Sequence, residues 1–354
     1  MSYFHDPEIS EMVEKVSEFF YIYDVQKHEN NIYFFGVPKH DMFHHKLWGI
    51  FYEKGYQLSF KYELGEYILI ASPLRAKERW WINLLLAAAT IFTTMLVGSL
   101  LFGADLVSNP SQVLKGIPFT IAIMTVLGAH EAGHYLVARL HGMRTSLPYF
   151  IPFPSIIGTM GAVIKHRGPI PHRKALFDVG VAGPLIGLIA SIIVTVIGLL
   201  LPPPVQQTQG GIQIQLGIPP LFEFITYLVR NNSTTLHPVA FAGWVGMLVT
   251  ALNLIPAGQL DGGHMLRAML GKRASHVSTL FPFVLISFGF YITYFQNLNG
   301  SLWVFWGLVL SLFAAAGHPQ PLNDEIPIGK ARMLLGTFTF MLGILCITPV
   351  PFQT

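Results

Sequence analysis

Residues 118–140 read PFTIAIMTVLGAHEAGHYLVARL, an apolar run in which ionisable side chains stand only in the second half. About 20 mostly apolar residues cross roughly 30 Å of hydrocarbon as a helix, so this run is long enough to span a membrane. It contains His130, Glu131 and His134 in the pattern H-E-x-x-H. Positions i and i+4 share a helix face, so both imidazoles can reach one metal ion while Glu131 lies near its bound water. Ionisable groups at membrane depth are costly and usually functional, so the run predicts both a membrane helix and a metal site.

The whole chain has the composition of a membrane protein. Of its 354 residues 52% are hydrophobic and only 12% are charged, whereas about a quarter of residues are charged in soluble domains. We expect a polytopic α-helical membrane protein with six to seven transmembrane helices. The candidate segments are residues 81–102, 118–140, 175–201, 238–254, 279–295, 302–316 and 332–347, the last three being the weakest.

One apolar stretch, residues 147–164, is unsuited to a continuous helix. Its helix-disfavouring residues are Pro148, Pro152, Pro154, Gly158 and Gly161. Irregular backbone is tolerated at membrane depth only where protein or a cavity satisfies its polar groups. We therefore expect a re-entrant hairpin.

Residues 1–75 differ from the rest in their mixed charges and many aromatic side chains, and predict a small soluble α+β domain. Helices are expected at residues 7–20 and 41–54, and strands at 31–37, 56–62 and 67–71. Residues 76–354 form the expected membrane domain, with its core at 80–275. A further helix is expected around residues 221–229, in the loop after the third span.

The basic residues give an orientation. With the N-terminal domain in the cytosol, fourteen Lys and Arg residues from Arg75 onward fall on the inside and only Lys115 and Arg230 fall outside. This agrees with the positive-inside rule. A formal net charge of +3 gives no reason to expect a nucleic-acid partner, and the single cysteine, Cys346, excludes a disulfide framework or a cysteine metal cluster.

A catalytic zinc usually has three protein ligands and one open position for water, so a third ligand is needed. The candidates are Asp178, early in the third span, and Asp261, just after the fourth. Both the second and the fourth span run inward, which brings Asp261 to the depth of His130 and His134. Pro and Gly residues around Asp261 give its backbone the freedom to aim a carboxylate at the metal. Asp261 is therefore favoured, and Asp178 stays open as the alternative.

Two sequence motifs together make the chain resemble the site-2 protease family of intramembrane zinc metalloproteases. That family pairs H-E-x-x-H with N-x-x-P-x-x-x-L-D-G, which stands here at residues 253–262 as NLIPAGQLDG, about 120 residues further on. The resemblance also covers GTMG at 158–161 and DVGVAGP at 178–184, and is good over roughly residues 75–275. The soluble N-terminal region is similar to the chloroplast and cyanobacterial-type branch; an archaeal branch is the other candidate.

The resemblance implies one Zn²⁺ per chain, held by His130, His134 and Asp261, with Glu131 as the general base. It implies that Asn253 positions substrate or stabilises the oxyanion. A further set of residues would bind substrate in the hairpin: Gly158, Thr159, Met160 and Gly161.

The expected reaction is hydrolysis of peptide bonds in or near transmembrane segments of single-span or other membrane proteins, in a prokaryotic cell membrane. Residues 1–75 would regulate substrate access. A membrane zinc transporter and an inactive membrane scaffold are the alternatives; transport would need polar ligands along a whole path across the membrane.

Overall fold

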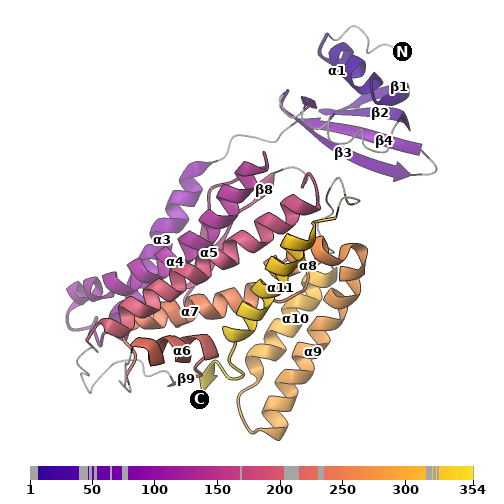
Figure 1. Cartoon of the computed structure of the whole chain (residues 1–354). Helices are drawn as coiled ribbons and strands as arrows, with labels where there is room; N and C mark the ends of the chain where they lie inside the picture. Colours follow the sequence, from indigo (N-terminus) through magenta and orange to yellow (C-terminus); the bar gives the residue numbers. More distant parts are fainter. Residues whose placement is uncertain are drawn as a thin grey trace. The chain divides into compact units, whose positions relative to one another are not determined.

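The computed structural model describes residues 7–39, 47, 50–51, 54–63, 66–73, 79–167, 170–202, 215–229, 235–315, 321, 324 and 327–353. The chain divides into two compact units, one built mainly on the residues before Arg79 and the other mainly on the residues from Arg79 onward. Figure 1 shows a small sheet-containing unit and a larger helical unit.

The N-terminal unit is a four-stranded antiparallel sheet with a helix. Its elements are α1 (Pro7–Ser17), β1 (Phe20–His28), β2 (Asn31–Pro38), β3 (Tyr56–Glu63) and β4 (Glu66–Pro73), and the strand order is β1-β2-β4-β3. Met12 and Val16 of α1 are buried together with Phe34 and Leu69 of the sheet. Burial of one apolar helix face on one sheet face is the source of its core.

The small α+β fold of this unit is confirmed, but strand β1 was not expected from the sequence. The first helix ends at Ser17, and the chain enters β1 at Phe20. Tyr21 and Tyr23 of β1 are exposed, and a register shift falls between Ile22 and Asp24. The apolar alternation that identifies a strand is therefore interrupted in β1. The helix expected at residues 41–54 lies mostly outside the described residues.

Every one of the seven apolar segments forms a helix in the second unit. They correspond to α3 (Trp80–Leu101), α4 (Ile117–Leu140), α5 (Arg173–Leu200), α7 (Pro238–Asn253), α9 (Ala274–Phe295), α10 (Ser301–Ala315) and α11 (Lys330–Leu345). Shorter elements lie between them: η1 (Pro110–Gly116), α6 (Pro220–Val229), α8 (Asp261–Leu270) and η2 (Gly271–Arg273), with β9 (Gln215–Leu216) paired to β10 (Phe352–Gln353).

Within the described residues, four helical stretches are long and apolar enough to cross a membrane: residues 80–101, 110–140, 173–200 and 261–295. The expectation of six to seven spans is confirmed only this far. Helix α7 has 16 residues, a length of about 24 Å at 1.5 Å per residue, which is less than the usual hydrocarbon thickness.

Helix α5 lies at the centre of the helical unit, where it packs against α4, α7 and α8 (Figure 1). Large apolar side chains, among them Phe119, Phe241 and Trp244, fill the core between α4 and α7. The seam between α5 and α7 is built from small residues instead, with Ser191 against Gly246 and Thr195 against Gly243. Small residues at a helix seam allow backbones to approach closely, as is typical of membrane helix packing.

The stretch expected as a hairpin forms one, without helix. Strand β6 (Tyr149–Pro152) pairs antiparallel with β7 (Thr159–Val163), and β5 (Arg144–Thr145) pairs with β8 (His166–Arg167) at the base. The hairpin connects α4, which carries His130 and His134, to α5, which packs against both α4 and α8.

Candidate metal centre

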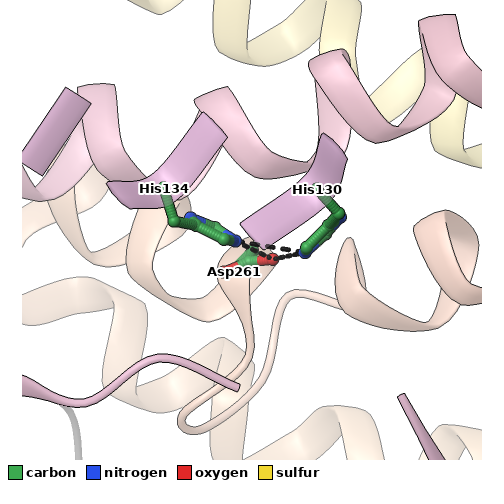
Figure 2. Close-up of side chains that lie close together, drawn as sticks. All are labelled: His130, His134 and Asp261. Carbon is green, nitrogen blue, oxygen red and sulfur yellow. Dashed lines mark hydrogen bonds and ion pairs between the residues drawn. The ribbon is translucent and has the colours of Figure 1, made fainter. Parts of the chain in front are cut away.

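Three side chains distant in sequence converge on one point. His130 and His134 come from α4 and Asp261 from the first residue of α8, and Figure 2 shows all three pointing toward one another. The Asp261 Oδ2 atom lies 3.3 Å from His130 Nε2 and 3.2 Å from His134 Nε2. The two Nε2 atoms are 3.1 Å apart. This is the one group of possible metal ligands found within the described part of the chain.

These separations fit a tetrahedral metal ion. With metal–ligand bonds of about 2.0–2.1 Å, neighbouring corners of a tetrahedron are about 3.3–3.4 Å apart. The three ligand atoms therefore already stand near the positions of three corners. The histidine side chains are almost fully buried. A metal cation here would therefore be coordinated mainly by these side chains and little by bulk water.

The hydrogen bond made by Nδ1 of His134 leaves its other ring nitrogen, Nε2, available to bind a metal. Its Nδ1 lies 2.8 Å from the backbone carbonyl oxygen of Val179 in α5. A carbonyl oxygen only accepts, so Nδ1 carries the proton and donates it, and Nε2 presents its lone pair to Asp261 and His130. A hydrogen bond of this kind fixes the tautomer and ring orientation of a metal-binding histidine.

A glycine on α5 makes room for this imidazole. A Cβ atom at Gly183 would overlap Nε2 of His134, the atom that faces the ligand group. Only the absence of a side chain at this position lets α4 and α5 approach closely enough for the Val179 contact.

Helix α8, which carries Asp261, is stabilised at both ends. Asp261 stands in the first turn of α8, where the helix dipole favours a negative charge. At the other end, Arg173 of α5 donates from Nη2 to the carbonyl oxygens of Ala268 and Met269, at 2.6 and 3.1 Å. Arg173 thereby satisfies carbonyls that the end of the helix leaves without intrahelical partners.

Glu131 lies beside the ligand group and is 5% exposed. The backbone N–H of Ile164, the residue that follows β7, lies near the Glu131 carboxylate. The expected base is thus on the helix that β7 approaches, close to the end of this strand. A peptide held along the hairpin would have the carboxylate close to its backbone.

Asn253, at the last position of α7, also faces the site. Its Nδ2 lies 3.3 Å from His130 Nε2. The structure therefore brings the expected polar residue of the second motif to the ligand atoms of the first.

Asp178, the alternative third ligand, is engaged elsewhere. Its two carboxylate oxygens accept from Nε and Nη2 of Arg332 at 2.7 and 2.8 Å, and Oδ2 is also 2.9 Å from Nε2 of His141. These contacts join α5, α11 and the end of α4. Asp178 is not among the three side chains whose ligand atoms converge.

The four expected substrate-binding residues lie in the hairpin, away from the ligand atoms. Gly158 has a φ of +82° and ends the turn, while Thr159 is buried with its Oγ1 donating to the Ile151 carbonyl at 2.9 Å. Met160 is 61% exposed, and Gly161 has a φ of +102°. Met160 is the one side chain of the four that offers a large exposed surface.

Sequence patterns did not single out Val179, Arg173 or His166. The first acts through its backbone carbonyl, which carries no sequence signal. His166 lies in β8, its Nδ1 is buried without a hydrogen-bond partner, and burial lowers the pKa of its imidazole. Its position two residues beyond Ile164 could have drawn attention only once the hairpin was known to reach Glu131.

Comparison with known proteins supplies the family. The sequence model of Peptidase family M50 matches residues 118–294, which is half of the chain. No solved structure matches it significantly.

Curated relatives are chloroplast proteins. "Probable zinc metalloprotease EGY2, chloroplastic" of Arabidopsis thaliana is 28% identical over 292 residues, covering 78% of this chain and 50% of that protein. "Probable zinc metalloprotease EGY1, chloroplastic" of Oryza sativa subsp. japonica is 29% identical over 67% of this chain and 41% of that protein. "Probable zinc metallopeptidase EGY3, chloroplastic" of Arabidopsis thaliana is 26% identical over 77% of this chain and 49% of that protein.

The chain spans about half the length of the curated relatives that it matches. These names confirm the resemblance to the chloroplast-type branch and do not bear out a prokaryotic membrane. Since the M50 match includes both metal motifs and the helices that carry them, the chain belongs to Peptidase family M50, the site-2 protease family.

Proposed function

We propose that this protein is a membrane-embedded zinc metalloprotease that hydrolyses peptide bonds in or near the transmembrane segments of other membrane proteins. The observation that carries the proposal is the convergence of the His130, His134 and Asp261 ligand atoms, with Glu131 beside them, between apolar helices. Family membership and the names of the relatives support zinc as the metal and peptide hydrolysis as the reaction.

The residues present fit one zinc ion per chain, held by His130, His134 and Asp261 with a fourth position open. When bound, zinc lowers the pKa of a coordinated water toward about 7 and polarises a carbonyl group. Glu131 accepts the proton of the attacking water and delivers it to the leaving amine. The Asn253 amide, 3.3 Å from His130 Nε2, is placed to donate a hydrogen bond to the oxygen of the scissile carbonyl.

The two alternatives are less well supported. A transporter needs ligands at several depths, and the described residues hold a single metal-ligand group. An inactive scaffold has no use for a buried glutamate, yet Glu131 is buried next to that group.

A cleavage assay with the purified full chain tests the proposal. We expect a fluorescently labelled single-span membrane protein to be cut in detergent or vesicles, cleavage to stop on removal of zinc with a chelator, and cleavage to return when zinc is added back. Chelator-insensitive cleavage would exclude the metal mechanism. Movement of zinc into sealed vesicles without any cleavage would favour a transporter.

Seven spans and a cytosolic N-terminal domain complete the proposal. Each apolar segment is a helix, and α7 is covered almost completely by its neighbours, so it could cross without meeting lipid along its length. The distribution of Lys and Arg supports a cytosolic position for residues 1–75 and for the metal centre's side of the membrane. The relatives leave open which membrane this is.

The hairpin is proposed as the place where substrate is held. Strand β7 pairs with β6 on one edge, and the described residues provide no strand for its other edge. An unpaired edge can take up an extended peptide as an added strand, which exposes the peptide's carbonyls to attack. The approach of β7 to α4 supports this because α4 carries the base, and Ile164, directly after β7, lies near the Glu131 carboxylate.

Residues 1–75 are proposed to control substrate access without taking part in catalysis, leaving residues 76–354 as the protease domain. Every residue of the metal centre comes from Ile117 onward. We expect a truncated chain that begins at Ser72 to bind zinc and cleave a short unstructured peptide at a rate near that of the full chain. Its rates toward different full-length membrane substrates should change relative to one another, as measured in one competition assay. A folded, zinc-loaded truncation that cleaves no peptide would contradict this division of roles.

A further inference from the structure

Helix α3 holds the hairpin at its base through a buried asparagine. The Nδ2 atom of Asn83 donates to the carbonyl oxygens of Leu147 and Pro148 at 2.9 and 3.1 Å. Asn83 is only 6% exposed, while its neighbours Leu84 and Leu85 are 62% and 59% exposed. A polar side chain buried in an otherwise apolar helix needs hydrogen-bond partners, and those of Asn83 are both at the entrance to β6.

The same helix holds the hairpin at its tip. Thr93 Oγ1 lies 2.7 Å from the carbonyl oxygen of Gly158 and 3.1 Å from two carbonyls of its own helix. A hydroxyl has one proton to donate, and the shortest of the three contacts is the one to the hairpin. Gly158 packs tightly here: a Cβ would come within 2.8 Å of the Thr93 carbonyl oxygen and of Thr94 Cα.

The spacing of the two contacts matches the hairpin. Asn83 and Thr93 are ten residues apart, about 15 Å along a helix. Between them α3 packs mainly along β6, while β7, which pairs with β6, is close to α4 as well. From α3 the hairpin therefore leads through β6 and β7 toward α4 and to Ile164, whose backbone N–H lies near the Glu131 carboxylate.

We propose that Asn83 and Thr93 are positioning residues that fix the β6–β7 hairpin beside Glu131, so that capture of the substrate strand depends on α3. This deepens the proposed function and rests on it. A hairpin held only at its two ends by the chain could move away from Glu131, whereas the contacts to α3 set both its height along the helix and its distance from the base. The outer edge of β7 is then presented to the substrate in a constant position.

The test is a set of threonine variants in the full chain. Thr93→Val removes the hydroxyl but keeps the shape, Thr93→Ser keeps the hydroxyl, and Thr90→Val is the matched control, because the Thr90 hydroxyl donates only within α3, to Leu86 at 2.8 Å. With the labelled single-span substrate we expect Thr93→Val to raise KM about three- to tenfold with kcat little changed. Thr93→Ser and Thr90→Val should stay within about twofold of wild type, and all should bind zinc equally.

Hydrogen–deuterium exchange gives a second readout that does not depend on activity. Backbone amides of residues 149–163 should exchange faster in Thr93→Val and in Asn83→Leu than in wild type or Thr90→Val. If folded Thr93→Val showed the wild-type KM and the wild-type exchange rates of residues 149–163, the proposal would be overturned. It would also be overturned if Thr90→Val changed KM and exchange as much as Thr93→Val does. If wild type showed no cleavage dependent on Glu131, the proposed function would fail, and the exchange comparison would still show whether α3 holds the hairpin.

Discussion

Replacing Glu131 with Gln is expected to lower the rate of substrate cleavage by about 10²–10⁴-fold, the usual contribution of a general base. The variant should fold and bind zinc as wild type does. Glutamine has nearly the same size and its amide oxygen can still accept a hydrogen bond, but it cannot take the proton of the attacking water. Measurement of cleavage rate and zinc content on the same preparations tests the expectation.

Glu223→Gln is the matched control, because Glu223 is an exposed carboxylate in α6, in the same structural unit. It should cleave at the wild-type rate. Wild-type turnover by Glu131→Gln would exclude the mechanism proposed above, and zinc loss by that variant would show that Glu131 helps to hold the metal.

Replacing Asp261 with Ala is expected to abolish cleavage and to weaken zinc binding by more than about 100-fold, the upper range for residues that only support a ligand. The loss follows because Oδ2 is the one anionic ligand atom beside two imidazoles. Titration of the metal-free protein with zinc, followed by cleavage assays, measures both effects.

Asp178→Ala provides the contrast. It should keep the metal, because its carboxylate is held by Arg332 and His141 and not by the ligand group. It should lower thermal stability, since it removes the ion pair that joins α5 to α11. A variant pattern in which Asp178→Ala loses zinc and Asp261→Ala retains it would reverse the assignment of the third ligand.

Much of the helical architecture could be predicted because membrane helices are recognisable as long apolar segments of the sequence. Mostly apolar segments have few alternatives to a helix in a bilayer, and all seven that were identified form helices. The number that cross a membrane was harder to predict, because helices such as α7 are short and apolar for a different reason: they are buried among other helices. Strand β1 was missed because its aromatic residues Tyr21 and Tyr23 are exposed, so that burial does not follow a strict alternation.

For the candidate metal centre, the sequence by itself predicted the two histidines and the glutamate, since i and i+4 positions on one helix must share a face. It favoured Asp261 over Asp178 through the expected depth of two helices, but depth alone does not bring two groups into contact. The tertiary structure decided the rest. The Val179 carbonyl, the space at Gly183 and the contacts from Asn83 and Thr93 to the hairpin all depend on how closely two helices or a helix and a strand approach. Such approach distances depend on packing between segments that are distant in sequence. A backbone carbonyl or a missing side chain leaves no pattern in a single sequence, so these distances could not be predicted from it.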